Sequence, residues 1–154
     1  MNQTRRVFLR LTSKVAVSAL AVAAGLKPRL VDAAETRPVF EATAISEALK
    51  ALGASNPKAS TDIVFKAPDI AENGAVVPVE IESKLPNTRS IAILVEKNPH
   101  VMSAAFEIPD GTDPFVATRV KVAESSNIHA IVKTDAGVFY AIKLVKVTLG
   151  GCGG

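Results

Sequence analysis

The chain has 154 residues, with 18 basic and 15 acidic side chains, one cysteine and no tryptophan. Its net charge of +3 comes from the N-terminus, because residues 1–33 hold six of the basic residues and one of the acidic ones, leaving 12 and 14. A nucleic-acid-binding domain needs clustered Lys and Arg, so no nucleic-acid partner is expected. A single cysteine also excludes an internal disulfide.

The N-terminus is predicted to be an export signal that is cleaved after residue 33 or 34. The stretch "TRRVFLR", with Arg5 and Arg6, resembles the twin-arginine consensus. An apolar, alanine-rich run follows at 15–26, and it is too short to cross a bilayer, which needs about 20 residues. We therefore expect a periplasmic protein exported by the twin-arginine route, with no stable membrane span. An ordinary secretory signal and a membrane anchor are the alternatives.

Residues 38–53 have the pattern of an amphipathic helix. Phe40, Ala44, Ala48 and Leu52 recur every four residues, which places them on one helical face. Gly53 can end the helix. This helix is expected to pack on one edge of the following domain or on a partner, and 54–60 is predicted to be a loop.

After the loop, the apolar residues recur with a period of two, which is typical of strands. Pro78 lacks an N–H, so its strand is expected at a sheet edge or at a bulge. The run at 90–97 is the more apolar one and is expected to be central, whereas 135–137 forms a hairpin turn. The predicted strands are 62–67, 75–84, 90–97, 103–108, 115–123, 127–134 and 138–149.

Seven strands at regular spacing, joined by Pro-, Gly- and Asn-rich turns, predict an all-β, immunoglobulin-like β-sandwich with an N-terminal helix and a flexible C-terminal arm. The disulfide and the tryptophan of antibody domains are both absent, so the core must be aliphatic. The predicted organisation is signal peptide 1–33, helix and loop 34–60, sandwich 61–149 and arm 150–154.

No constellation of catalytic residues is visible in the sandwich. The two histidines, His100 and His129, lack metal-ligand spacing and are interpreted as structural or solvent-facing. Glu80 and Glu82 alternate along one strand and are interpreted as a solvated face. No nucleotide-binding or nucleophile motif occurs. The sequence therefore predicts no metal, no cofactor and no enzymatic activity of its own.

The functional chemistry of the chain is therefore predicted to lie in the C-terminal segment "LGGCGG". Cys152 is flanked by Gly150, Gly151, Gly153 and Gly154. Glycine accepts φ of either sign and carries no Cβ, so this arm is thin enough to enter a narrow channel. A free thiol has a pKa of about 8.5, and no cationic side chain adjoins the cysteine. Partner enzymes are therefore expected to supply the base or the oxidant.

These features resemble SoxY, the thiosulfate-carrying subunit of the SoxYZ complex of bacterial sulfur oxidation. The resemblance includes "KAPDIAENGAVVPVEIES" (66–83), "IAILVEKNP" (91–99), "FEIPDGTDPFVATRVKVAES" (106–125) and the final "VKVTLGGCGG". It covers nearly all of the chain after the signal.

The resemblance implies a sulfur carrier that pairs with a SoxZ-like subunit and is exported with it. A c-type cytochrome enzyme would join thiosulfate to Cys152, a hydrolase would release sulfate, and a molybdenum sulfane dehydrogenase would oxidise the remaining sulfur. Two other interpretations stay open. One is a ubiquitin-like sulfur carrier with a thiocarboxylate at Gly154, and the other is an assembly module whose Cys152 only forms an intermolecular disulfide.

Overall fold

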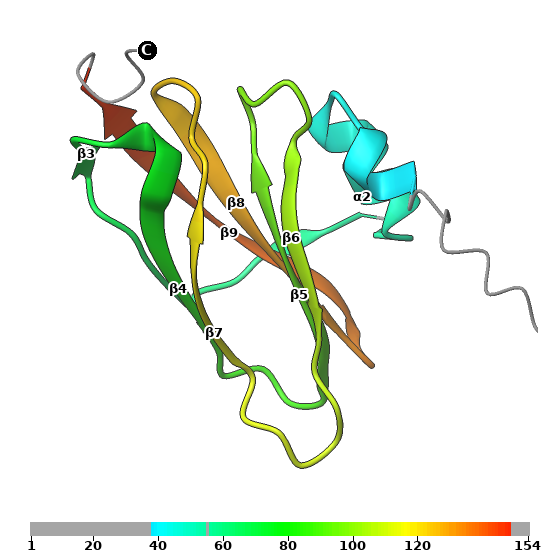
Figure 1. Ribbon diagram of the computed structural model, residues 1–154. Coiled ribbons are helices and arrows are strands. Elements are labelled where there is room, and N and C mark those ends of the chain that lie inside the picture. The colour runs from blue at the N-terminus through cyan, green and yellow to red at the C-terminus, as the bar shows by residue number, and fades with distance from the viewer. Residues whose placement is uncertain (1–37, 55, 149–154) are drawn as a thin grey trace, which may run out of the picture. The chain divides into compact units, whose positions relative to one another are not determined.

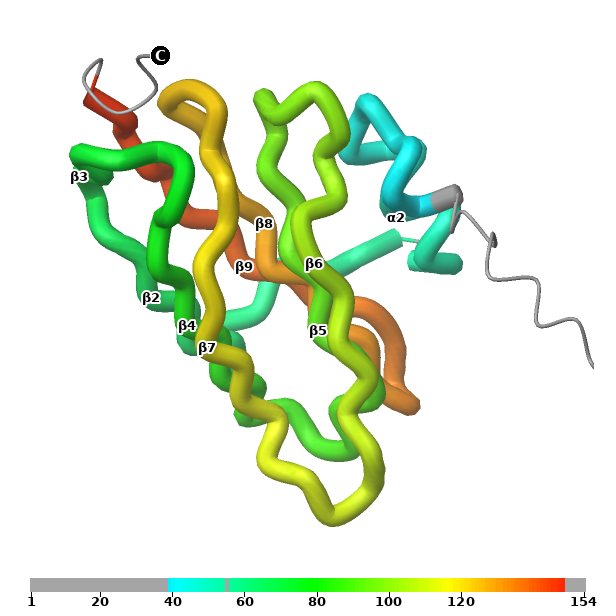
Figure 2. The backbone as a smooth tube through the Cα atoms, in the orientation of Figure 1, coloured from blue at the N-terminus to red at the C-terminus, as the bar shows by residue number. Residues whose placement is uncertain are grey.

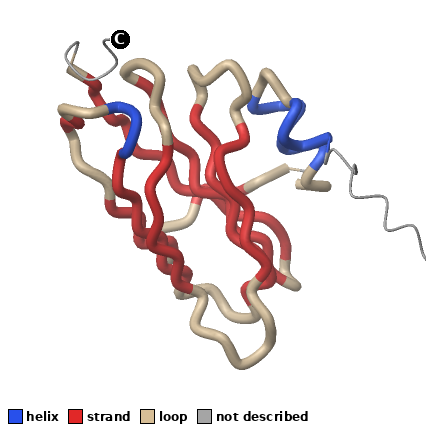
Figure 3. Tube along the Cα trace, in the orientation of Figure 1, coloured by secondary structure: helices blue, strands red, loops and turns tan. Residues whose placement is uncertain are grey.

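The computed structural model describes residues 38–54 and 56–148, which form two packed sheets and a short helical segment (Figure 1). One sheet has the strand order β1-β9-β8-β5-β6, with β3 also paired to β9, and the other has the order β2-β4-β7. Figure 3 shows the helical residues 38–41 and 45–51 at one side of the strands and the short helical turn 74–76 at the opposite side. The elements are η1 (Pro38–Glu41), α2 (Ile45–Ala51), β1 (Lys58–Ala59), β2 (Ile63–Lys66), β3 (Ile70–Ala71), η2 (Gly74–Val76), β4 (Val77–Ser83), β5 (Thr88–Val95), β6 (Met102–Glu107), β7 (Phe115–Val120), β8 (Ser126–Thr134) and β9 (Gly137–Val147).

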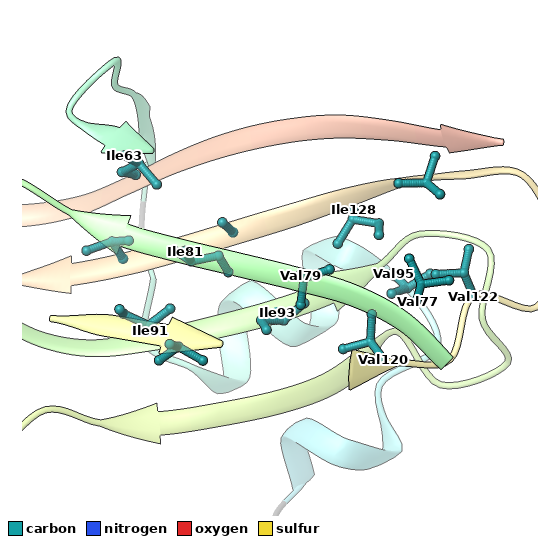
Figure 4. Close-up of a cluster of buried hydrophobic side chains, with 14 of the residues drawn as sticks. Ile63, Val77, Val79, Ile81, Ile91, Ile93, Val95, Val120, Val122 and Ile128 are labelled. Atoms are coloured by element: carbon teal, nitrogen blue, oxygen red, sulfur yellow. The ribbon is translucent and has the colours of Figure 1, made fainter. Parts of the chain in front are cut away.

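The core between the sheets is aliphatic, as the absence of tryptophan predicts. Side chains of a strand alternate between its two faces, and β4 follows this rule strictly, with Val77, Val79 and Ile81 buried and the residues between them exposed. They meet Ile93 of β5 and Ile128 of β8 (Figure 4). Burying such a side chain contributes about 1.5–3 kcal/mol, so this layer supplies most of the hydrophobic stabilisation.

The prediction of an immunoglobulin-like sandwich is confirmed. Seven of the strands have four or more residues, and each begins and ends within three residues of its predicted bounds. The structure adds β1 and β3, which have two residues each and run parallel to the two ends of β9. Such short strands have no period that the sequence could show.

The prediction that Pro78 marks an edge strand is wrong, because β4 is the central strand of its sheet. The N–H of Lys84 donates to the carbonyl of Asp62 beside β2, so the even-numbered residues of β4 direct their nitrogen toward β2. The pairing with β2 ends at Lys66 opposite Glu80. Pro78 lies beyond that end and faces no β2 carbonyl. Its missing N–H therefore removes no hydrogen bond from the sheet.

The predicted continuous helix over 38–53 is interrupted. The 3-10 turn η1 and helix α2 are separated by residues 42–44. The N–H of Thr43 donates to Oε2 of Glu47 at 3.0 Å, and the Thr43 hydroxyl lies 3.2 Å from the same oxygen. Both hydrogen bonds are donated by Thr43 and accepted by the Glu47 carboxylate, which lies in the first turn of α2 and holds the chain just before its N-cap residue, Ala44.

The helix covers a face of the sandwich, whereas the sequence predicted that it packs on an edge or a partner. Ala48 is fully buried in a second apolar cluster with Leu94 of β5, Met102 of β6 and Ile131 of β8. These side chains lie on the face of the larger sheet that is turned away from the core. Figure 2 shows α2 beside β6, with β4 and β7 on the other side. Among residues 38–54 and 56–148, no helix is long and apolar enough to span a membrane.

Candidate functional site

The predicted carrier residue lies outside the described part of the chain. This applies to Cys152, to the glycines at 150, 151, 153 and 154, and also to the predicted export residues Arg5 and Arg6. What the structure describes is the place where the arm leaves the domain, at the end of β9. We call Lys146, Val147 and Thr148, with the segments that hold them, the arm base.

Hydrogen bonds hold the arm base from both sides. On one side, the N–H of Lys146 donates to the carbonyl of Asp69 at 2.9 Å, and the N–H of Thr148 donates to that of Ala71 at 3.1 Å. On the other side, the N–H of Val147 donates to Oγ of Ser125 at 2.9 Å. The backbone is therefore fixed up to Thr148, and a hinge can begin only after that residue.

The turn that contains η2 packs against the arm base without room for another atom. A Cβ on Gly74 would clash with the carbonyl oxygen of Val122 and would lie 2.9 Å from Cγ1 of Val147. The Gly74 carbonyl accepts from the N–H of Val122 at 2.7 Å. Asn73 shapes the turn by accepting from the N–H of Ala75 at 2.9 Å. Glycine is required here for close packing.

The covalent geometry limits where the thiol can go. An extended chain advances at most about 3.6 Å per residue, so Cys152 can stand no more than about 14 Å from Thr148.

Near the base, Nζ of Lys143 lies 3.0 Å from Oδ1 of Asp69. Within residues 38–54 and 56–148, no group of three His, Cys, Asp or Glu side chains could hold a metal ion. The described base fixes the point from which the arm starts.

A polar cluster on the outer face of the larger sheet was not anticipated from the sequence. Nε2 of His129 is buried, makes no hydrogen bond within the described residues and lies 3.7 Å from Oε2 of Glu96. Asn127 donates to the same carboxylate oxygen at 2.9 Å. Burial lowers the pKa of His129, against the opposing effect of the Glu96 charge. Sequence reasoning missed the cluster because its members come from β8 and the end of β5.

The other polar residues that the sequence singled out are not brought together. His100 is exposed, and Glu80 and Glu82 are exposed on β4, with Nζ of Lys66 3.5 Å from Oε2 of Glu80. The interpretation of this face as solvated is confirmed.

An ion-pair cluster near the start of β9 joins β5 to two loops, the one between β6 and β7 and the turn between β8 and β9. Arg89 donates through Nε and Nη2 to the two carboxylate oxygens of Asp135 at 2.7 and 2.8 Å, and it also contacts Asp110. The guanidinium hydrogen bond holds the pKa of Asp135 below its usual value. The cluster lies at the start of β9 and the arm base at its end, so it ties loops together away from the arm.

Comparison with known proteins gives a family model and several solved structures that resemble the chain. The family model described as "Sulfur oxidation protein SoxY" matches residues 48–152. The sulfur carrier protein SoxY from Chlorobium limicola f thiosulfatophilum is 34% identical, with a TM-score of 0.60 over 66% of this chain and 92% of that chain.

A superoxide reductase (neelaredoxin) from Ignicoccus hospitalis is 23% identical, with a TM-score of 0.50 over 56% of this chain and 80% of that chain. At this identity the likeness concerns the fold alone. No curated protein sequence matches the chain.

Proposed function

Because the chain belongs to the SoxY family of sulfur oxidation proteins, we propose that it is a periplasmic sulfur carrier that binds thiosulfate-derived intermediates covalently on Cys152. The observation that carries the proposal is the extent of the family match, which runs to residue 152 and so includes the one cysteine of the chain. The anchored arm base supports it, because the domain is held rigidly up to Thr148 and the glycines follow directly.

The proposed chemistry takes place on the sulfur of Cys152. A sulfur–sulfur bond forms between its thiolate and the outer sulfur of thiosulfate, and the electron pair released goes to a c-type cytochrome enzyme. Hydrolysis then releases the sulfonate group as sulfate and leaves a persulfide on the cysteine. A molybdenum sulfane dehydrogenase would oxidise that outer sulfur to a sulfonate, taking three oxygen atoms from water and passing six electrons to its own electron acceptor. A second hydrolysis would release the sulfonate as sulfate and restore the thiol. The carrier contributes position, and its partners contribute the catalytic groups.

The proposal assigns separate roles to the parts of the arm. Gly150, Gly151, Gly153 and Gly154 let Cys152 enter several active sites, since glycine offers no side chain to clash. A SoxZ-like subunit completes the carrier complex. Arg5 and Arg6 direct export by the twin-arginine route, and Arg5→Lys with Arg6→Lys should leave the precursor inside the cell. Export of that variant through the ordinary secretory route would contradict this part.

The test is the intact mass of the exported protein with and without reductant, together with thiosulfate consumption in a reconstituted assay. Cys152→Ser should fold normally, carry no reducible sulfur adduct and support no turnover. A chain that lacks 150–154 and still supports turnover would refute the carrier role. Sulfur retained in Cys152→Ser would point to a thiocarboxylate at Gly154. Loss of only a covalent dimer, with unchanged turnover, would indicate an assembly module.

A second variant tests the slenderness of the arm. Gly151→Val with Gly153→Val keeps the thiol but adds two branched side chains. It should leave thermal stability unchanged and slow each partner enzyme by more than about tenfold, because the arm no longer fits a narrow channel. Unchanged turnover would show that the glycines are not needed.

A further inference from the structure

The last residues of β9 run beyond the strand that pairs with them. β8 begins at Ser126, which lies opposite Val145. Continued by two residues, this register would place the backbone of Glu124 opposite Val147, but residue 124 belongs to the loop between β7 and β8. Figure 1 shows this loop at the same end of the sheets as the last residues of β9. Within residues 38–54 and 56–148, no strand therefore lines the β8 side of the arm base.

The side chain of Ser125 takes the place of the missing strand. Its Oγ accepts a hydrogen bond from the N–H of Val147 at 2.9 Å and donates to the Val147 carbonyl at 3.4 Å. A hydroxyl can do both because it carries one donor and two acceptor lone pairs. A residue of a paired antiparallel strand would exchange the same two bonds through its backbone. One side chain therefore reproduces a rung of the ladder beyond the end of β8.

Other hydrogen bonds fix the loop that presents this hydroxyl. Asn98, in the turn between β5 and β6, donates through Nδ2 to the carbonyl of Lys121 at 2.8 Å and accepts through Oδ1 from the N–H of Ala123 at 2.9 Å. Between them, Val122 is fully buried, and its N–H donates to the carbonyl of Gly74 at 2.7 Å. The loop is therefore anchored just before it reaches β9, and the Ser125 hydroxyl is held on a fixed support.

The two sides of the arm base are held by alternate residues, because successive N–H groups of a strand point to opposite edges. The N–H groups of Lys146 and Thr148 donate toward β3, and that of Val147 donates to Ser125 on the other side. β3 has two residues, and a chain held by one such short neighbour can still tilt about it. Ser125 supplies the opposing contact, so it decides the direction in which the chain leaves the domain at Thr148.

We propose that Ser125 is a positioning residue of the carrier, whose hydroxyl holds Val147 so that the arm starts from one fixed point and in one direction. The inference rests on the proposed function for the use of the arm, and it adds the side chain that aims it. A tilt of about 20° at the base moves the far end of an extended arm of about 14 Å by about 5 Å. An arm with a fixed start also has fewer conformations to lose when it enters a channel. Ser125 acts through Val147 and takes no part in the sulfur chemistry.

The experiment uses the full chain, co-expressed with the SoxZ-type subunit of the same organism, loaded with thiosulfate and offered to the sulfate-releasing hydrolase. In Ser125→Ala, the KM of the hydrolase for the carrier should rise by about threefold or more with kcat unchanged, because a looser arm loses more conformations on binding. The rate at which iodoacetamide alkylates Cys152 in the unloaded chain should change by less than about twofold, because the thiol itself is not altered.

Ser60→Ala is the matched control. Ser60 is half-buried, as Ser125 is, and its Oγ accepts from the backbone N–H of Asp62 at 3.1 Å. Its own N–H donates to the carbonyl of Tyr140, in the first half of β9, so it lies away from the arm base. The substitution removes the same kind of hydrogen bond and should change the KM by less than about twofold.

Hydrogen exchange measures the contact directly. In Ser125→Ala, the Val147 amide should exchange about threefold to tenfold faster, which is the range that the loss of one hydrogen bond gives. The amide of Val132, in the buried part of β8, should exchange at the rate of the wild type. Unchanged exchange at Val147 would overturn the inference.

Two further variants isolate the hydroxyl. Ser125→Thr keeps it, whereas Ser125→Val replaces it with a methyl group in a side chain of the same shape. The Thr variant should match the wild type in KM and in Val147 exchange, and the Val variant should match Ser125→Ala. Equal KM values for the two would overturn the inference. A Ser125→Ala chain that melts at a lower temperature but keeps the wild-type KM would also overturn it, because Ser125 would then serve stability alone.

Failure of the inference and failure of the carrier role are distinguishable. Normal sulfur adducts on Cys152, together with a KM that does not depend on Ser125, would refute only the positioning role. A wild-type chain that carries no reducible sulfur adduct would refute the carrier role, even where the Val147 amide exchanges faster in Ser125→Ala.

Discussion

The two outer faces of the sandwich differ in what covers them. On the smaller sheet, β4 alternates strictly, and Pro78, Glu80 and Glu82 face solvent. On the larger sheet, β5 has five consecutive buried residues, 91–95, because its outward side chains lie under the helical segment. The first face is mostly polar and meets solvent directly, with Phe115 as an exposed exception. The second face is partly covered by the helical segment. The uncovered part of the second face, with Ile142 and Leu144, therefore stands out.

The largest expected effect is a loss of stability when a side chain on the outer face of the larger sheet, beneath the helical segment, is shortened. Leu94 is fully buried beneath α2, so Leu94→Ala removes buried surface and leaves a cavity. We expect the free energy of unfolding to fall by about 3 kcal/mol, measured by urea denaturation. A loss below about 1 kcal/mol would mean that the helical segment packs too loosely to count as a cover.

A somewhat smaller effect is expected where the larger sheet ends at the arm base. Gly74→Ala adds a Cβ against the carbonyl of Val122 and the side chain of Val147, which forces the turn away from β9. Overpacking of this kind costs about 2 kcal/mol, again measured by denaturation. Ala75→Ser, at the exposed next position, is the control and should be close to neutral. Equal stability of both variants would show that the turn does not hold the arm base.

The stability of the fold should decrease at mildly acidic pH because of His129, which lies on the outer face of the larger sheet. Burial lowers the pKa of folded His129, so the unfolded chain binds the proton more readily. The folded state then keeps full stability above the unfolded pKa of about 6.5 and loses it as the pH falls below that value.

His129→Gln should therefore reduce the drop in melting temperature between neutral and mildly acidic pH. His100→Gln, at an exposed histidine, is the matched control. Identical pH profiles for wild type and His129→Gln would contradict the assignment.

The smallest effect is expected on the polar face of the smaller sheet. Lys66 and Glu80 form an ion pair at 3.5 Å with both side chains about half exposed or more. Exposed pairs of this kind contribute little because water and salt screen them. Lys66→Met should shift the melting temperature by no more than roughly 2 °C. A larger loss would show that this face depends on its charges and would weaken the contrast between the faces.

The strands could be predicted from the sequence because their pattern is local. In β4 and β8, the inward positions hold Val, Ile or Ala at every second residue, except at the strand ends, where Ser or Thr is buried. This period can be seen without knowing any neighbour. The tail could be singled out for the same reason, since Cys152 and its glycines adjoin in the chain. Its role stays a prediction, as do the signal peptide, the domain bounds and the export route.

Two of the three misses depend on which strands pair, and the third depends on a local contact at the start of a helix. Pro78 was expected at an edge because only its missing N–H was visible, whereas the length of β2 decides whether that donor is needed. The helix was expected to run through residues 42–44, but Thr43 and Glu47 start α2 later. The His129–Glu96 contact depends on the pairing of β5 with β8, which no spacing in the sequence specifies.

By itself, the sequence determined the family, the strand positions, the aliphatic core and the lone thiol on a glycine tail. Each of these features depends on adjacent residues or on a short repeat of apolar residues. Only the tertiary structure decided that the helix covers part of one outer face, that Ile70 lies opposite Lys146 of β9, and that β3 and Ser125 hold the arm base up to Thr148. The physical reason is that burial and hydrogen bonding at these places depend on which strands lie side by side. That choice belongs to the packed chain as a whole.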